Sequence, residues 1–205
     1  MEIKNISKEE GAFEREPCIL VENVISEDCR KVLTALMSLE YVQNSLSDRM
    51  VAGSDEMYGT PTLCVINQIM LNKVKQLIKK PTLYPTYGFY RKYYKGQDLE
   101  KHIDRPECEL TVSICLSESD DSEWPLYVAD TKNNITYKGH TKPGDAIIYT
   151  GEFLPHWRDE CPKDWCKQFF LHYSTDSRLK FDPNSDSYKD KLIVRHLIES
   201  YLEQD

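Results

Sequence analysis

The sequence predicts an α+β protein in which two amphipathic helices precede an antiparallel barrel or double-sheet jelly roll, and a third helix follows it. Apolar residues recur at helical spacing over about 26–40, 61–80 and 188–203, whereas from about 84 to 175 they alternate with a period of two. The strand-like runs in this region are short and numerous, with turn residues between them, as in barrels and jelly rolls.

The two N-terminal helices have clear start and stop signals. Ser26 suits an N-cap, and Glu27 and Asp28 follow it in the first turn, where the helix dipole favours acids. Pro61 suits the first position of the second helix, which ends before Pro81. Their expected buried faces are Val32, Leu33, Leu36 and Met37 in the first helix, and Leu63, Ile66, Ile69, Met70, Val74, Leu77 and Ile78 in the second.

The expected strands are the aromatic or alternating runs 87–94, 109–116, 124–128, 135–137, 146–149 and 168–173, with an additional short strand at 18–24. The polar stretches 1–16 and 43–59 are expected to lack regular structure. The helix at 188–203 carries an apolar stripe that could cover the barrel or form a homodimer, and the sequence leaves both open.

Composition narrows the class of protein. A chain of 205 residues, 40% apolar and 29% charged, is most simply one soluble domain spanning residues 1–205. It contains no apolar run long enough for a membrane span and no N-terminal apolar signal segment, so a cytoplasmic location is expected. The net charge of −8 argues against nucleic acid as a partner. Seven irregularly spaced cysteines without a Cys-x-x-Cys pair are expected to be free and mostly buried thiols.

The most informative residues are His102 and Asp104, followed 52 residues after Asp104 by His156. Residues two apart in an extended segment point the same way, so His102 and Asp104 can reach one ion. A histidine from a distant strand can complete the set. Two imidazoles and one carboxylate are the ligands of the facial triad that holds non-haem Fe(II) and leaves positions open for a co-substrate and O2.

The order of these features resembles the 2-oxoglutarate/Fe(II) oxygenases, most closely their prolyl 4-hydroxylase-like branch. The similarity extends over about residues 84–175. It rests on Tyr93, on Gly96 six residues before His102, on the turn Pro143-Gly144-Asp145 leading into a strand, and on His156. The resemblance implies a double-stranded β-helix, a jelly-roll (cupin-like) core. It also implies that His102, Asp104 and His156 bind Fe(II), with 2-oxoglutarate and O2 as co-substrates.

The far carboxylate of 2-oxoglutarate needs a cation. In the resembled family a Lys or Arg opens the last core strand about ten residues after the distal histidine. Cys166 occupies that tenth position, so Lys167 fits if the preceding loop has one extra residue. Arg158 competes, because it lies two residues after His156 and can hold a carboxylate in a bidentate way. Arg105 is a weaker third option that could instead pair with Glu107 or Glu109.

Two departures from the prolyl 4-hydroxylase-like pattern concern the co-substrate pocket. Leu99 stands where that branch often has a tyrosine supporting the co-substrate, three residues before the first histidine ligand. Tyr93 and Tyr90 are therefore counted as candidates for the pocket, and Thr111, Ser113 or Tyr127 could also supply the hydroxyl. The segment 124–128 replaces a Gly-Gly-containing stretch, so prolyl specificity does not follow from the resemblance.

The resemblance thus implies a dioxygenase that hydroxylates an unactivated C–H bond of a peptidyl substrate, prolyl included, or of a small molecule, and releases succinate and CO2. Halogenation is disfavoured because Asp104 is present where halogenases of this superfamily have a small residue. The alternatives are a non-catalytic jelly-roll metal-binding or interaction module, and a nucleic-acid demethylase of the same superfamily. A cupin-like enzyme without an oxo-acid ranks last, because the chain has only five histidines.

Overall fold

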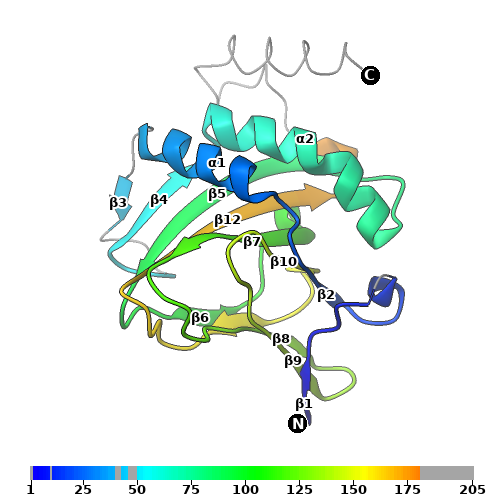
Figure 1. Ribbon diagram of the computed structural model, residues 1–205. Helices are drawn as coiled ribbons and strands as arrows, with labels where there is room; N and C mark the ends of the chain where they lie inside the picture. Colours follow the sequence, from blue (N-terminus) through cyan, green and yellow to red (C-terminus); the bar gives the residue numbers. More distant parts are fainter. Residues whose placement is uncertain (1, 10, 40–42, 46–49, 181–205) are drawn as a thin grey trace.

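The computed structural model describes residues 2–9, 11–39, 43–45 and 50–180 (Figure 1). Its strands and α-helices are, in chain order, β1 (Glu2–Asn5), β2 (Cys18–Val21), α1 (Glu27–Leu39), β3 (Gln43–Ser45), β4 (Ser54–Tyr58), α2 (Pro61–Ile78), β5 (Tyr84–Tyr94), β6 (Leu99–His102), β7 (Leu110–Glu118), β8 (Leu126–Asp130), β9 (Ile135–Gly139), β10 (Ala146–Tyr149), β11 (His156–Arg158) and β12 (Trp165–Ser174). Short 3-10 turns occur at Ala12–Glu14, Pro106–Cys108 and Ser177–Leu179.

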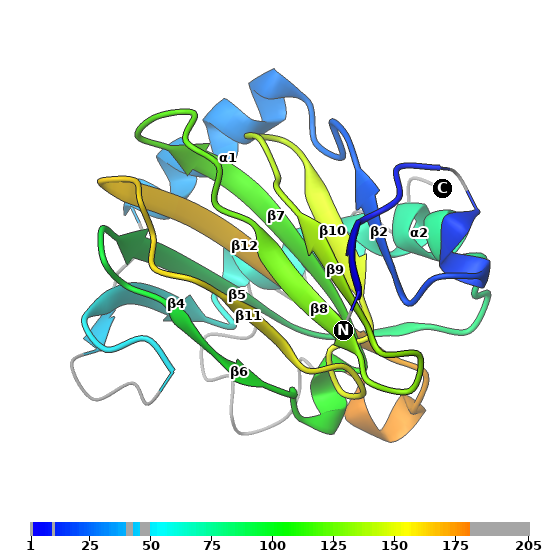
Figure 2. The same ribbon diagram turned by 90° about the horizontal axis from the view of Figure 1, so that it is seen from below.

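The strands form two sheets. The larger has the order β2-β10-β7-β12-β5-β4-β3 and the smaller has the order β1-β9-β8-β11-β6. Neighbouring strands are antiparallel except for β1 and β9, which are parallel. In Figure 1 the strands β6, β8 and β9 lie below β5, β7 and β12, and the view from below in Figure 2 looks through the smaller sheet toward the larger one. Most consecutive strands from β5 to β12 alternate between the two sheets. Segments that are distant in the sequence therefore lie close together at one end of the barrel.

Both helices cover the outer face of the larger sheet (Figure 1). Thr60 begins α2 by accepting a hydrogen bond from the backbone N–H of Leu63, and Pro61 follows in the first turn. Leu63 and Val74 on α2 are fully buried in a core shared with the outward side chains of β5, β7, β10 and β12. The helices therefore stabilise the sheet from outside and leave the space between the sheets for other side chains.

Odd- and even-numbered residues of a central strand face two different environments, the core under the helices and the space between the sheets. On β12, Phe169, Leu171 and Tyr173 belong to the core under the helices, whereas Phe170 and His172 line the space between the sheets. The same alternation holds on β5, β7 and β10, where Thr111 and Cys115 on β7 and Ile147 and Tyr149 on β10 point away from the core under the helices. Each central strand thus contributes one row of residues to packing and another to the interior of the barrel.

Several sequence predictions are confirmed. The helices at 27–39 and 61–78 match the two expected N-terminal helices, and the seven cysteines are free, with only Cys29 exposed. The helix expected at 188–203 lies outside the described residues. No helix in the described part of the chain is long and apolar enough to cross a membrane.

Two predictions about irregular segments are wrong. The stretch 43–59 contains β3 and β4, with β4 paired to β5, and the stretch 1–16 contains β1, paired to β9. Both β1 and β4 are polar and lie toward the edges of their sheets, where backbone pairing rather than a buried apolar face specifies the strand. Their sequences consequently carry little of the alternation that marked the central strands.

Candidate metal centre and co-substrate pocket

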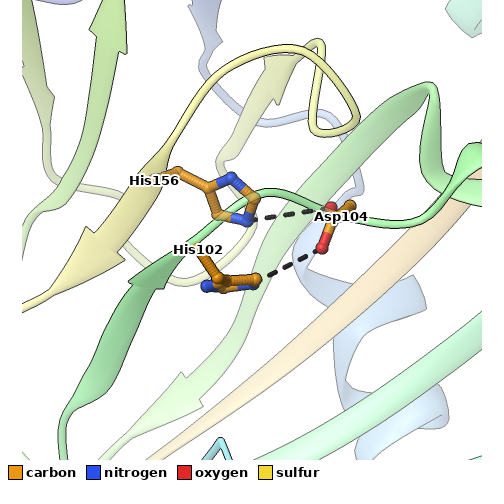
Figure 3. Close-up of side chains that lie close together, drawn as sticks. All are labelled: His102, Asp104 and His156. Atoms are coloured by element: carbon orange, nitrogen blue, oxygen red, sulfur yellow. Dashed lines mark ion pairs between the residues drawn. The ribbon is translucent and has the colours of Figure 1, made fainter.

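Two neighbouring strands of the smaller sheet bring His102, Asp104 and His156 together. His102 ends β6, Asp104 follows two residues later, and His156 begins β11, directly opposite His102 in the antiparallel pair. Figure 3 shows all three side chains converging on one point. The Nε2 atoms of His102 and His156 lie 3.4 and 3.7 Å from the two carboxylate oxygens of Asp104, and the imidazole ring centroids are 4.3 Å apart.

The other ring nitrogen of each histidine is held by a backbone carbonyl. His102 Nδ1 lies 2.7 Å from the oxygen of Glu100, and His156 Nδ1 lies 3.0 Å from the oxygen of Leu154. A carbonyl only accepts, so each Nδ1 carries the proton and donates. Each Nε2 then presents its lone pair toward Asp104, which is the arrangement of metal-binding histidines.

Burial and mutual contact set the charges of these groups. Burial lowers the pKa of His156 to about 4, so its imidazole is neutral at neutral pH. Burial opposes ionisation of His102 and Asp104 as well, but it is outweighed by hydrogen bonds and charge attraction together: contacts with Asp104 and the Glu100 carbonyl raise the pKa of His102, and the neighbouring imidazoles lower that of Asp104. The site therefore offers a cation an ionised carboxylate at Asp104 and a neutral imidazole at His156.

Asp104 is enclosed on its remaining sides. Thr111 Oγ1, on β7, lies 3.2 Å from Asp104 Oδ2, and the backbone N–H of Asp104 donates to the carbonyl of Gly151 at 3.0 Å. A Cβ atom at position 151 would lie only 2.2 Å from Asp104 Oδ2. The carboxylate thus occupies a slot that only glycine leaves open.

The triad opens into a cavity of about 190 Å³ between the sheets. Beside the three triad residues its walls are mostly aromatic and apolar. They are Met50, Tyr58, Tyr87, Phe89, Arg91, Tyr93, Leu99, Tyr149, Phe170 and His172. Among the described lining residues Asp104 is the only acid, so the cavity suits a ligand with apolar or anionic groups.

Arg158 is the buried cation that sequence analysis placed near His156. It lies two residues along β11, is 2% exposed, and packs over the Trp124 ring at 4.7 Å. Its Nη1 donates to the carbonyl of Trp124 at 2.8 Å, while Nε and Nη2 have no hydrogen-bond partner among the described residues. A buried guanidinium with unused donors is costly, and a ligand carboxylate would satisfy it.

The structure does not bring Lys167 or Tyr90 to the cavity. Lys167 shares its side of β12 with Phe169 and Leu171, pairs across the sheet with Lys92, and has its Nζ 5.3 Å from the Trp165 ring centroid. Tyr90 belongs to the core under the helices. Tyr93, by contrast, lines the cavity, and burial raises the pKa of its hydroxyl, which stays neutral.

Other residues weighed in the sequence occupy clear positions. Arg105 lies outside the cavity lining, over the rings of Tyr58 and Tyr87, with its Nε 3.7 Å from Glu107. Leu99 lines the cavity as an apolar residue.

Sequence reasoning missed Arg91, which lines the cavity and forms an ion pair with Glu56 at 3.2 Å. The sequence contained the necessary clue, because Arg91 is an even number of residues from Tyr87 and Tyr93 and so lies on the same face of β5. Its partner Glu56 lies on β4, the strand that sequence analysis expected to be a loop.

No protein-family model and no curated protein matches the chain. Solved structures do match. An oxidoreductase of the 2OG-Fe(II) oxygenase family from Burkholderia pseudomallei superposes with a TM-score of 0.69 at 12% identity, over 86% of this chain and 95% of that one. A Pseudomonas putida prolyl-4-hydroxylase gives a TM-score of 0.60 at 12% identity, over 78% and 95% of the two chains.

A third match is the epimerase SnoN from nogalamycin biosynthesis, solved with Fe3+, alpha ketoglutarate and nogalamycin RO. It superposes with a TM-score of 0.64 at 10% identity, over 84% of this chain and 88% of that one. The chain therefore has the double-stranded β-helix fold of the 2OG-Fe(II) oxygenases, as its sequence predicted.

Proposed function

We propose that this protein is an Fe(II)- and 2-oxoglutarate-dependent dioxygenase. The observation that carries the proposal is the convergence of His102, Asp104 and His156, with both Nδ1 protons donated to backbone carbonyls and both Nε2 atoms directed at the carboxylate. This donor set is the one that non-haem Fe(II) prefers. Bound iron and 2-oxoglutarate would supply oxidative decarboxylation and a strong oxidant for an unactivated C–H bond.

Arg158 is the residue that we propose for the far carboxylate of 2-oxoglutarate. It lies two residues after His156 on β11, is buried behind the cavity lining rather than part of it, and has two nitrogen atoms without partners among the described residues. A guanidinium can hold a carboxylate through two parallel hydrogen bonds. We assign no such role to Lys167, because its side chain is on the opposite face of β12 from the cavity.

The remaining cavity walls bind substrate and exclude water. Tyr58, Tyr87 and Phe89 form a continuous aromatic wall, with ring centroids 4.6 Å apart for the first pair and 6.3 Å between Tyr58 and Phe89. We propose hydroxylation of an apolar or aromatic group, carried by a peptide, prolyl included, or by a small molecule. Because the similar folds include both a hydroxylase and an epimerase, the products must be identified directly.

The test is anaerobic reconstitution with Fe(II) and 2-oxoglutarate, followed by admission of O2. The expected results are a visible metal-to-ligand charge-transfer absorption and slow formation of succinate, both lost in His102→Ala. Lys167→Ala is the matched control and should behave like the wild type. Iron binding without the absorption band and without succinate would overturn the oxygenase proposal and favour a non-catalytic metal-binding module.

A further inference from the structure

A hydrogen-bond chain reaches Asp104 from the larger sheet. Thr111 on β7 is fully buried, and its Oγ1 lies 3.2 Å from Asp104 Oδ2 and 3.1 Å from His172 Nδ1. His172 is 6% exposed and stands directly opposite Thr111 in the pairing of β7 with β12. The chain thus connects the carboxylate of Asp104 to an imidazole on β12, the central strand of the larger sheet.

The direction of these hydrogen bonds follows from counting protons. A carboxylate can only accept, so the single hydroxyl proton of Thr111 is donated to Asp104 Oδ2. Thr111 Oγ1 must then accept from His172, which places a proton on Nδ1. This assignment holds for the neutral and the charged imidazole alike, since both can carry that proton.

A second metal site at these residues is disfavoured. Asp104, His172 and Cys108 offer ligand atoms within 4.8 Å of one another. Burial raises the pKa of Cys108 to about 12, however, and its thiol lies 3.0 Å from the Tyr87 hydroxyl. His172 Nδ1 and the Cys108 thiol are thus already engaged with Thr111 and Tyr87, respectively. The cluster is therefore better explained as support for Asp104 than as an independent binding site.

We propose that Thr111 and His172 are positioning residues that act in series to fix the Asp104 carboxylate for metal binding. The inference rests on the proposed function, because it treats Asp104 as a metal ligand. Thr111 and Gly151 contact the Asp104 carboxylate on two sides and leave it only a narrow slot. The hydroxyl of Thr111 therefore fixes the rotation of the carboxylate within that slot. Hydrogen-bond partners of metal ligands commonly contribute about 10- to 100-fold in metal affinity.

Matched substitutions separate hydrogen bonding from packing. Thr111→Val keeps the shape and removes the hydroxyl, whereas Thr111→Ser keeps the hydroxyl. His172→Asn retains an N–H near the position of Nδ1, whereas His172→Gln places its amide farther out. Each variant is titrated with Co(II) alone, without 2-oxoglutarate or O2, and its ligand-field absorption gives the affinity. Thermal unfolding of the metal-free protein reports whether each variant is folded.

Thr111→Val and His172→Gln should each weaken Co(II) binding about 10- to 100-fold, while Thr111→Ser and His172→Asn should stay close to the wild type. The double variant Thr111→Val/His172→Gln should lose no more than one single variant, because either change breaks the same chain. Additive losses, or equal losses in the conservative variants, would overturn the series arrangement. Unchanged binding in all variants would overturn the proposal, whereas a wild type that binds no Co(II) would instead overturn the proposed function.

Discussion

Replacing Gly151 with alanine should disable the metal centre through a single added carbon. Gly151 does not have a positive φ, so alanine is compatible with its backbone. The new Cβ would nevertheless lie 2.2 Å from Asp104 Oδ2, 2.9 Å from Thr111 Oγ1 and 3.0 Å from the carbonyl oxygen of Cys108. Contacts shorter than 3.0 Å are essentially never seen for real Cβ atoms, and two of the three neighbours are themselves held in place.

The size of the effect follows from these contacts. To restore a 3.0 Å contact, the Asp104 oxygen must move by about 0.8 Å. Functional constellations tolerate displacements of only about 0.5 Å. We therefore expect Co(II) and Fe(II) affinity to fall at least about tenfold, the lower range for losing support of a metal ligand. Overpacking should also cost about 1–3 kcal/mol of stability, and each kcal/mol lowers Tm by about 2–4 °C in a domain of this size.

Gly139→Ala on β9 is the matched control. Its Cβ would meet the methyl ends of Ile6 and Ile147 at 2.7 and 3.0 Å, so it also overpacks the interior but does not touch the triad. The assay combines a Co(II) titration with thermal unfolding of the metal-free protein. We expect both variants to lose stability and only Gly151→Ala to lose metal affinity. Wild-type metal affinity in Gly151→Ala, or an equal loss in Gly139→Ala, would refute the reasoning.

Three further predictions use other parts of the structure. Arg158→Lys should weaken 2-oxoglutarate binding about 10- to 100-fold, as expected for losing charge-assisted hydrogen bonds, whereas Lys167→Ala should leave it unchanged. Succinate formation measured against the 2-oxoglutarate concentration tests this, and an equal loss of affinity in the two variants would contradict it. Burial lowers the pKa of His156 and His172 to about 4, and unfolded histidine titrates near about 6.5. The unfolded chain therefore binds more protons than the folded chain between these pH values. The free energy of unfolding of the metal-free protein should fall as pH falls from about 6.5 to 4, by up to about 1.4 kcal/mol per pH unit for each group. The raised pKa of His102 partly offsets this loss. Urea unfolding at pH 7 and pH 5 tests this, and equal free energies would count against it. Gly88→Ala, whose Cβ would lie 2.8 Å from a side-chain atom of α2, should lower Tm without changing Co(II) affinity.

The sequence was sufficient for the features that depend on local spacing. Helical and twofold periodicities located both described helices and the central strands, because each of those elements buries one face. The pair His102 and Asp104 was recognisable as a candidate ligand pair because two residues on one side of an extended segment can reach one ion. His156 required only that a later strand return to the same end of the barrel.

The choice between Lys167 and Arg158 as the cation proposed for 2-oxoglutarate could not be made in this way. Whether Lys167 points inward depends on which face of β12 borders the cavity, and Lys167 shares its face with Phe169 and Leu171 in the core under the helices. Successive residues of a strand point to opposite faces, but alternation alone does not say which face is covered by the helices. Because β12 is buried on both faces, its sequence gives no polar side from which to choose. The side of β11 on which Arg158 lies could be predicted, because residues two apart on a strand point the same way and Arg158 follows His156 by two residues.

The alternation along the central strands has a consequence for how this protein could change over time. Odd residues of β12, such as Phe169 and Leu171, belong to the layer under the helices, whereas Phe170 lines the cavity, as does Phe89 on β5. Substitutions at such wall positions, which hold neither a proposed metal ligand nor its supporting hydrogen bonds, can therefore alter which molecule is accommodated while the packing beneath α1 and α2 stays intact. The residues that determine stability alternate along the same strands with those that determine selectivity. Single substitutions at cavity positions can therefore change substrate specificity without changing the core that stabilises the fold.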